Sequence, residues 1–534
     1  MKRNDFFGIK SLVGLALRRD RLKLPLWLVG ISLMILSIVH AYAEFSAQEM
    51  KDMIIMAAAN PGMRLFVAPI SMGVIGDIGT FFLFRMSFII AIMVGIMSIQ
   101  IVVRHTRHNE ETGCAELLSS TVLGRYASLT AALIVAICAN IILSFMMAFA
   151  MIAGGLPAGG SFVAGFSFGA FGIIFAGIAA ICVQLSENSR GSSGLASMAL
   201  AFVFLINAVG NILGKVNAGG LGYESAWPVW LSPLGWVQQM HAYDENNWWI
   251  LILFVVLLVP LVYSAFILVN RRDIGRGILA AKPGPGDAPK SLLSPLGLAW
   301  RLQRGALLGW MIPIALFALI FGGASQDFGE TIEGVEMFEQ VLAAAAENFG
   351  FMMISVMSVI ISIYTMQSLL RKRTEEDGGP LEAVLATPVK RSTWMASHII
   401  CSVVGTLILL VIFALGLAVA SEATSSQTIA YIKMALYQGS GIIALAGCII
   451  AVYGLLPRIS RTLSWVVVMF AMLAGPFFGA LLDLPEGLQE ISPFSHVGLV
   501  PADITASGII ILIIVGVLLG AIGMVSFNRR NLSL

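Results

Sequence analysis

Charged side chains are scarce in this chain of 534 residues: only 12% are Asp, Glu, Lys or Arg, whereas 58% are hydrophobic. An average soluble domain has roughly 25% charged residues, so the composition excludes an ordinary soluble protein. The ten-residue alternation of a membrane β-barrel is also missing. The formal net charge of +2 is spread over loops between apolar segments, and it gives no reason to expect nucleic acid as a partner.

Cysteine and nucleotide-binding motifs are equally rare. The five cysteines fit no metal-ligand spacing and predict no disulfide framework. A Walker A motif is lacking, since Gly214-Lys215 has neither the upstream glycine nor the following Ser or Thr. We therefore expect a chain that binds no cofactor and does not hydrolyse ATP by itself.

Apolar runs of about 20 residues recur along the whole chain, and each can cross the hydrocarbon core of a membrane as a helix. About twelve spans are predicted, at 24–43, 81–103, 126–152, 161–184, 196–214, 248–270, 305–323, 348–369, 393–419, 428–453, 463–482 and 506–525. Most of the 32 basic residues flank the same side of these spans, which places both termini in the cytoplasm. The fold class we expect is an all-α polytopic protein of a bacterial plasma membrane.

The second half of the chain repeats motifs of the first half in the same order. The matched motifs are Arg18-Arg19-Asp20-Arg21 with Arg301-Leu302-Gln303-Arg304, Glu110-Glu111-Thr112-Gly113 with Glu375-Glu376-Asp377-Gly378, and Asn270-Arg271-Arg272 with Asn528-Arg529-Arg530. Because each half has an even number of spans, the halves are predicted to be parallel six-helix repeats. We expect a first half over 1–272, a cytoplasmic linker over 273–297 and a second half over 298–534.

A segment ahead of the first span of each half, 5–19 and 290–303, mixes apolar and basic side chains. This pattern is typical of amphipathic helices that lie on a membrane surface. An ordinary positively charged flank is the alternative, and the repetition of the pattern favours a real element in both halves.

Two predicted cytoplasmic loops, 104–125 and 370–391, are the best candidates for a partner-binding site. Each has a basic cluster, paired glutamates, a glycine, a further glutamate and a closing arginine. A short charged helix between two long spans suits docking into a groove, with its opposite charges setting the orientation; a solvated hairpin is the alternative. The predicted docking residues are Glu110, Glu111, Gly113, Glu116 and Arg125 in the first loop, and Glu375, Glu376, Gly378, Glu382 and Arg391 in the second.

The predicted spans contain almost no acidic residue or histidine, which an ion-coupled transporter would use inside the membrane. His398 is the exception, and it lies near the cytoplasmic end of its span. Energy for transport is therefore expected from outside the membrane, and the two loops are the natural place for a separate ATPase to act.

The two glutamate loops, the segment Asn60-Pro61-Gly62-Met63-Arg64 and the terminal arginine pairs resemble those of ABC-2 type permeases. The nearest resemblance is to the double-length permeases of polyketide-antibiotic exporters of the tetronasin-resistance type, and it covers essentially the whole chain. It implies a type V exporter-like architecture in which each half has an elbow helix, a coupling helix and a broken outer hairpin, here at 215–247 and 483–505. It also implies two copies of a separate ABC ATPase that uses ATP and Mg, and contact with membrane lipids.

The resemblance further implies a substrate path between the second and fifth spans of both halves. Met and Phe side chains there would form an adaptable apolar surface for a hydrophobic small molecule. The candidates are Phe84, Phe88, Met93, Phe204, Asn207, Met353, Met357, Met469 and Met472.

The function we expect is that of the permease subunit of an ATP-driven exporter of hydrophobic compounds such as antibiotics. An ABC-2 exporter of lipids or glycolipids is one alternative. A proton-coupled secondary transporter is another, although the shortage of intramembrane acids argues against it. A signalling or immunity component that transports nothing is a further alternative.

Overall fold

The computed structural model describes residues 5–59, 63–70, 76–119, 123–217, 222–273, 275–279, 287–330, 339–377, 379–475, 485–501 and 504–530. The chain forms two compact units, Met1–Pro283 and Gly284–Leu534, called unit 1 and unit 2. The boundary between them lies within the segment 273–297. Each unit has its own large cluster of buried apolar side chains.

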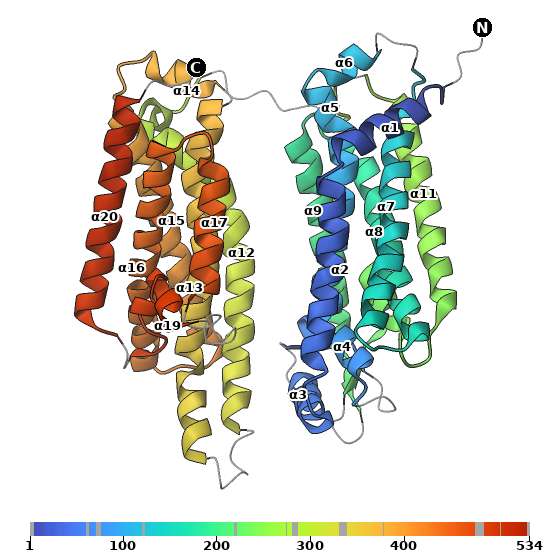
Figure 1. Cartoon of the computed structure of the whole chain (residues 1–534), viewed down its shortest axis with the longest axis horizontal. Helices are drawn as coiled ribbons and strands as arrows, with labels where there is room; N and C mark the ends of the chain where they lie inside the picture. Colours follow the sequence, from blue (N-terminus) through green and yellow to red (C-terminus); the bar gives the residue numbers. More distant parts are fainter. Residues whose placement is uncertain are drawn as a thin grey trace. The chain divides into compact units, whose positions relative to one another are not determined.

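Unit 1 is a bundle of long apolar helices (Figure 1). Its elements are α1 (Ile9–Arg19), α2 (Lys23–Tyr42), α3 (Ala47–Ala59), η1 (Met63–Leu65), α4 (Ile78–His105), α5 (Arg107–Glu111), α6 (Cys114–Ser119), α7 (Ala127–Ala153), α8 (Ala158–Leu185), α9 (Ser189–Ile212), β1 (Lys215–Val216), β2 (Tyr223–Glu224), η3 (Trp227–Leu231), α10 (Pro233–Gln239), η4 (Trp248–Ile250) and α11 (Leu251–Asn270). Figure 1 shows α1, α5 and α6 at one end, which we call the polar end of unit 1, and α3 at the opposite end.

The centre of unit 1 is α8, which packs against α4, α7 and α11. Glycines on α8 let α7 approach closely, as small residues do in membrane helices. A Cβ atom on Gly169 would lie 1.9 Å from Ser144 Oγ, and one on Gly172 would lie 1.9 Å from Asn140 Oδ1. The contact of α7 with α8 therefore depends on the missing side chains.

Unit 2 repeats this plan around α16 (Figure 1). Its elements are η5 (Lys290–Leu293), α12 (Pro295–Glu330), α13 (Glu339–Asp377), α14 (Pro380–Leu385), α15 (Arg391–Ala420), α16 (Ser425–Leu455), α17 (Ser460–Leu473), α19 (Glu486–Gln489), η6 (Pro493–His496) and α20 (Ala506–Arg529). The end that carries α14 and the last residues of α20 is the polar end of unit 2.

The helices confirm the predicted all-α polytopic membrane fold. Within the described residues, eleven helices are long and apolar enough to cross a membrane, and each overlaps one predicted span. The remaining predicted span, 463–482, begins as the shorter apolar helix Ser460–Leu473. Its continuation over 476–484 lies outside the described residues.

The elbow differs between the units. In unit 1, α1 is a separate helix that ends at Asp20, whose carboxylate is held by Arg104 at 2.6 Å and His105 at 2.5 Å. In unit 2 the expected elbow segment 290–303 is instead η5 followed by the first part of the continuous helix α12. The matching residue there is Gln303, a neutral side chain that accepts from Ser368 at 2.7 Å within the bundle. The break between α1 and α2 in unit 1 begins at this anchored residue.

The predicted outer segments share one anchoring contact. In 215–247, Ser232 donates its hydroxyl to the carbonyl of Val203 on α9 at 2.8 Å. In 483–505, Ser492 donates to the carbonyl of Ala471 on α17, also at 2.8 Å. Both serines are fully buried, so the repeated Ser-Pro pair fastens each outer segment to the helix that precedes it.

Arg64 connects three segments at the end of unit 1 that carries α3. Its Nε donates to the carbonyl of Ala58 at 2.6 Å, and its Nη1 donates to that of Gly214 at 3.1 Å. The guanidinium also lies over the ring of Tyr223, on the β1–β2 hairpin, at 5.4 Å. Residues 60–62 of the same motif lie outside the described residues.

Candidate functional site

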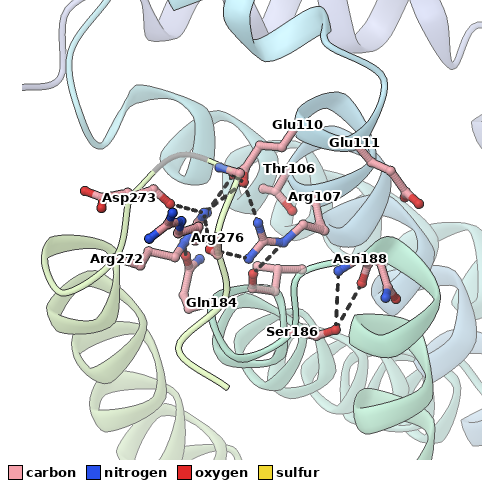
Figure 2. A network of polar contacts seen from close by, with 12 residues as sticks. Thr106, Arg107, Glu110, Glu111, Gln184, Ser186, Asn188, Arg272, Asp273 and Arg276 are labelled. Atoms are coloured by element: carbon pink, nitrogen blue, oxygen red, sulfur yellow. Dashed lines mark hydrogen bonds and ion pairs between the residues drawn. The ribbon is translucent and has the colours of Figure 1, made fainter. Parts of the chain in front are cut away.

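The first glutamate of the unit 1 loop is held by arginines (Figure 2). Glu110 lies on α5, directly after the long helix α4. Its Oε1 accepts from Arg272 Nη2 at 2.6 Å, and its Oε2 accepts from Arg272 Nη1 at 2.8 Å and from Arg107 Nη1 at 2.6 Å. A two-point contact between guanidinium and carboxylate is among the stronger polar contacts in proteins, so α5 is firmly attached to the end of α11.

Arg107 extends this attachment to α8. Its side chain is fully buried, and Nε donates to the carbonyl of Val183 at 3.1 Å while Nη2 donates to that of Arg276, also at 3.1 Å. The backbone N–H of Gly275 donates to Glu110 Oε2 at 3.2 Å. The loop after α4 is thus fastened to α8 and to the segment that follows α11.

Glu111 points to a different element. Its Oε2 accepts from the backbone N–H of Ser189 at 3.2 Å and from the hydroxyl of the same residue. Ser189 is the first residue of α9, and a carboxylate at a helix N-terminus is favoured by the helix dipole. Adjacent glutamates of the loop therefore contact the end of the sixth span and the start of the fifth.

Unit 2 contains the same arrangement with different residues. The Oε2 of Glu376 accepts from Arg530 Nη2 at 2.7 Å and from the Tyr453 hydroxyl at 2.9 Å, and Arg373 lies at 3.2 Å. The neighbouring Asp377 forms ion pairs of 2.9 Å with Arg373 and with Arg461 on α17. We call the Glu110–Arg272 and Glu376–Arg530 pairs the clamps of unit 1 and unit 2.

These contacts change the alignment of the second loop on the first by one residue. The sequence comparison paired Glu111 with Glu376, but the clamps pair Glu110 with Glu376. Both glycines that follow, Gly113 and Gly379, have positive φ, +73° and +86°, so Gly379 is the counterpart of Gly113. The predicted residue Gly378 lies outside the described residues. Paired acidic residues in each loop fit two registers equally well, and only the contacts distinguish them.

Arg125 and Arg391, the predicted arginines that close the two loops, make matching contacts. Arg125 donates to the carbonyls of Val269 at 3.2 Å and Asn270 at 3.0 Å, at the end of α11. Arg391 donates to the carbonyl of Arg530 at 3.0 Å, after α20. Each arginine satisfies carbonyls that the last helix of its unit leaves unpaired.

The predicted docking residues therefore divide into two groups. The side chains of the clamp residues Glu110 and Glu376 are largely covered, at 12% and 2% exposed. Glu375 pairs with Arg371 at 3.2 Å along α13. Glu116 on α6 and Glu382 on α14 are exposed. Direct contact with a partner is thus open to the exposed residues of α6 and α14, whereas the clamps connect these short helices to the bundle.

The candidate path residues of unit 1 are partly brought together. Phe88 on α4 and Phe204 on α9 have ring centroids 4.1 Å apart, and Phe66 lies 5.4 Å from Phe88. Asn207, on the turn after Phe204, is buried, and neither amide atom has a hydrogen-bond partner among the described residues. Phe84 instead packs on Phe81 at 6.2 Å, near the start of α4. Met93 packs against the unit 1 core.

The candidate path residues of unit 2 lie in different surroundings. Met357 is buried in the core, with Met353 packed against that core. On α17, Met472 is partly buried and Met469 is 39% exposed. The structure thus brings Phe88 and Phe204 together in unit 1 and leaves the four methionines of unit 2 in different surroundings, and the substrate path stays a prediction.

Sequence reasoning missed the basic partners of the clamps. Arg107, Arg272 and Arg530 hold the glutamates, and Tyr453 supplies a hydroxyl. The sequence did contain a signal for these partners, because an Arg-Arg pair, 271–272 and 529–530, ends each half. A repeated acidic pair and a repeated basic pair in one chain are candidates for mutual contact.

Comparison with known proteins identifies the family. A family described as "Multidrug efflux system permease Rv1217c, C-terminal domain" matches residues 9–268 and 292–528. The chain is 31% identical over 546 residues to the multidrug efflux system permease protein Rv1217c of Mycobacterium tuberculosis (strain ATCC 25618 / H37Rv), with 99% of this chain and 96% of that protein covered. The chain therefore belongs to the Rv1217c family of multidrug efflux system permeases, which makes it a multi-pass membrane transporter component rather than a catalytic enzyme.

Proposed function

We propose that the chain is the transmembrane permease subunit of an ATP-driven ABC exporter of the ABC-2 type. It moves hydrophobic compounds, antibiotics among them, out of the cytoplasm or the inner leaflet of the plasma membrane. Two copies of a separate ABC ATPase supply the energy from ATP and Mg. The permease name of the M. tuberculosis relative supports drug efflux, and the resemblance of the loops to those of tetronasin-resistance permeases supports the ATPase.

The pair of clamps is the observation that carries this proposal. In each unit, a short exposed helix follows a carboxylate that is bound to the end of the last span. Neighbouring acids also bind the start of the preceding span, at Ser189 in unit 1 and at Arg461 in unit 2. A force on α6 or α14 is thereby transmitted to three spans of the same unit, namely the second span, which precedes the loop, and the fifth and sixth spans. A loop that served only as a connection would have no need of buried charges, which are costly to desolvate.

The charges indicate the side on which the ATPase binds. In unit 1, Arg18, Arg19, Arg104, Arg125 and Arg272 all belong to elements of the polar end. Basic residues flank the cytoplasmic ends of membrane spans. We therefore infer that the polar ends of both units face the cytoplasm, where the proposed ATPase would find its nucleotide.

The experiment reverses the exposed charges. In the complex of the full chain with its ATPase, the double variant Glu116→Arg and Glu382→Arg is expected to lower ATPase binding and drug-stimulated ATP hydrolysis by at least about tenfold, since a mismatched charge at an interface costs several kcal/mol. Asp287→Arg, an exposed reversal in the linker, is the matched control. Both variants should reach the membrane at the wild-type level.

Three results would count against the proposal in different ways. Unchanged ATPase binding and stimulation in the double variant would refute docking at α6 and α14. Loss of stimulation in the Asp287→Arg control would show a general effect of charge. Hydrolysis that responds to lipids and ignores drugs would replace the drug substrate with a lipid and leave the docking assignment intact.

A further inference from the structure

A large cavity lies at the polar end of unit 1, between the elbow helix α1 and α7. Its volume is about 670 Å³, which is within the range of small-molecule sites and far above the roughly 30 Å³ that a water molecule occupies. Close-packed interiors have few voids larger than a water molecule. Apolar side chains of both helices line it, Leu12 and Leu15 from α1 and Leu129 from α7.

Small residues on two helices leave this space open, and unit 2 has large rings in their place. The register set by Arg125 and Arg391 pairs Ser128 with Trp394 and Ala132 with His398, and Arg272 with Arg530 pairs Val269 with Phe527. Ser128, Ala132 and Val269 line the cavity. In unit 2, the Trp394 ring lies 4.9 Å from that of His398 and stacks on that of Phe527 at 5.7 Å.

The fold reinforces this difference between the units. Unit 1 has a separate elbow helix above the small residues, whereas unit 2 continues the corresponding segment into α12. Trp394 is 2% exposed and Phe527 is fully buried. The smaller side chains and the separate elbow helix that border the cavity are therefore both features of unit 1.

The mouth of the cavity carries charges of both signs. Arg19 supplies an exposed guanidinium that donates through Nη1 to Asn109, and Arg125 supplies one that donates through Nη2 to the carbonyls of Val269 and Asn270. Asp5 and Asp273 supply exposed carboxylates. Arg272 also lines it, but its guanidinium is bound to Glu110 in the clamp. Planar guanidinium groups bind phosphate oxygens well, and carboxylates bind ammonium groups. A ligand that suits this mouth has a phosphate and an ammonium on one polar head.

The walls and the position of the cavity define the rest of the ligand. The sides formed by α1 and α7 are mostly apolar, whereas the end of α4 and α5 contribute His105, Thr106, Asn109 and Glu110. The helix α1 also exposes Leu15 and Leu17, as expected of a helix at the boundary between lipid and water. We propose that this cavity is a binding site for one membrane phospholipid with a phosphoethanolamine head. The head lies among the arginines and aspartates of the mouth, and an acyl chain lies between α1 and α7. The site adjoins Glu110, so the bound lipid contacts the clamp of unit 1.

Native mass spectrometry of the full chain in detergent tests this directly, with dioleoylphosphatidylethanolamine as the probe and dioleoylglycerol as its headless counterpart. Ser128→Trp places the unit 2 residue in the cavity and is expected to lower phospholipid binding about tenfold. Ile134→Trp is the matched control, because it adds the same ring to an exposed position of α7. Arg19→Gln should abolish the preference for the phospholipid over dioleoylglycerol.

Equal phospholipid binding by wild type and Ser128→Trp would overturn the site, and an unchanged preference in Arg19→Gln would overturn the role of the mouth. Should Ser128→Trp fail to fold, a photoreactive phosphatidylethanolamine bound to the wild-type chain decides the question. Cross-links to 5–19 and 123–132 support the site, whereas cross-links confined to other segments refute it. The ATPase is absent from these measurements, so their outcome is independent of the proposed function.

Discussion

Glu376→Gln is the sharpest perturbation that the structure offers, because it changes a charge and leaves the shape almost intact. The carboxylate of Glu376 is 2% exposed and lies at 2.7 Å from Arg530 and 3.2 Å from Arg373. An amide oxygen can still accept from the Tyr453 hydroxyl, at 2.9 Å in the wild type. The substitution therefore removes the anion and leaves Arg530 without its carboxylate partner, whereas Arg373 keeps Asp377 at 2.9 Å.

The expected loss of stability follows from that burial. Removal of one partner from a buried ion pair costs about 3–5 kcal/mol. For a unit of about 250 residues, each kcal/mol corresponds to a shift in the unfolding temperature of about 2–4 °C. We therefore expect unit 2 of Glu376→Gln to unfold about 6–20 °C below the wild type.

Thermal unfolding of the full chain in detergent, followed by tryptophan fluorescence, measures this shift. Glu382→Gln is the control, because it makes the same chemical change at an exposed position of the same loop. Exposed substitutions away from special features change stability by at most about 0.5 kcal/mol. Equal shifts for Glu376→Gln and Glu382→Gln would show that the unit 2 clamp contributes nothing, and the argument from burial would fail.

Further predictions concern helix packing and pH. A Cβ atom on Gly447 would lie 2.2 Å from the carbonyl oxygen of Gly516, so Gly447→Ala is expected to cost about 1–3 kcal/mol, whereas Gly439→Ala, with nearest neighbours at 3.5 Å, should unfold at the wild-type temperature or above. Burial alone would raise the pKa of Asp20, but the hydrogen bond and charge of His105, together with nearby cations, lower it. The stabilisation that Asp20 provides is then present above its unfolded pKa of about 3.9 and is lost as the pH falls through the lower folded value. The gap in unfolding temperature between wild type and Asp20→Asn should accordingly be large at pH 7 and close below about pH 4; a gap independent of pH would contradict this assignment.

The apolar runs were sufficient to locate the long helices, because a membrane span is recognised by its length and hydropathy alone. The eleventh span, 463–482, is described only as far as the short helix Ser460–Leu473 and the two residues after it. The elbow of unit 2 could not be predicted from composition. Both segments mix basic and apolar residues, and one of their differences, Asp20 against Gln303, involves partners that are distant in sequence.

The candidate sites were predictable as loops but not as contacts. Sequence spacing identified the glutamates of both loops, yet the neighbouring acids left the register ambiguous until Arg272 and Arg530 were seen to bind Glu110 and Glu376. The cavity at α1 was hidden for the same reason. The contrast of Ser128 with Trp394 becomes visible only in the register that the contacts define.

The clamps also bear on how the chain is made. Glu110 is synthesised 162 residues before Arg272, and Glu376 is synthesised 154 residues before Arg530. Each carboxylate therefore lacks this partner until the ribosome has completed the sixth span of the same unit. Because neither clamp uses a residue of the other unit, unit 1 can close while unit 2 is still in the ribosome, in keeping with the folding of large chains domain by domain. A truncated product that ends before Arg271 would insert its helices but leave its loop unlocked, so the arginine pair marks the point at which a half becomes complete.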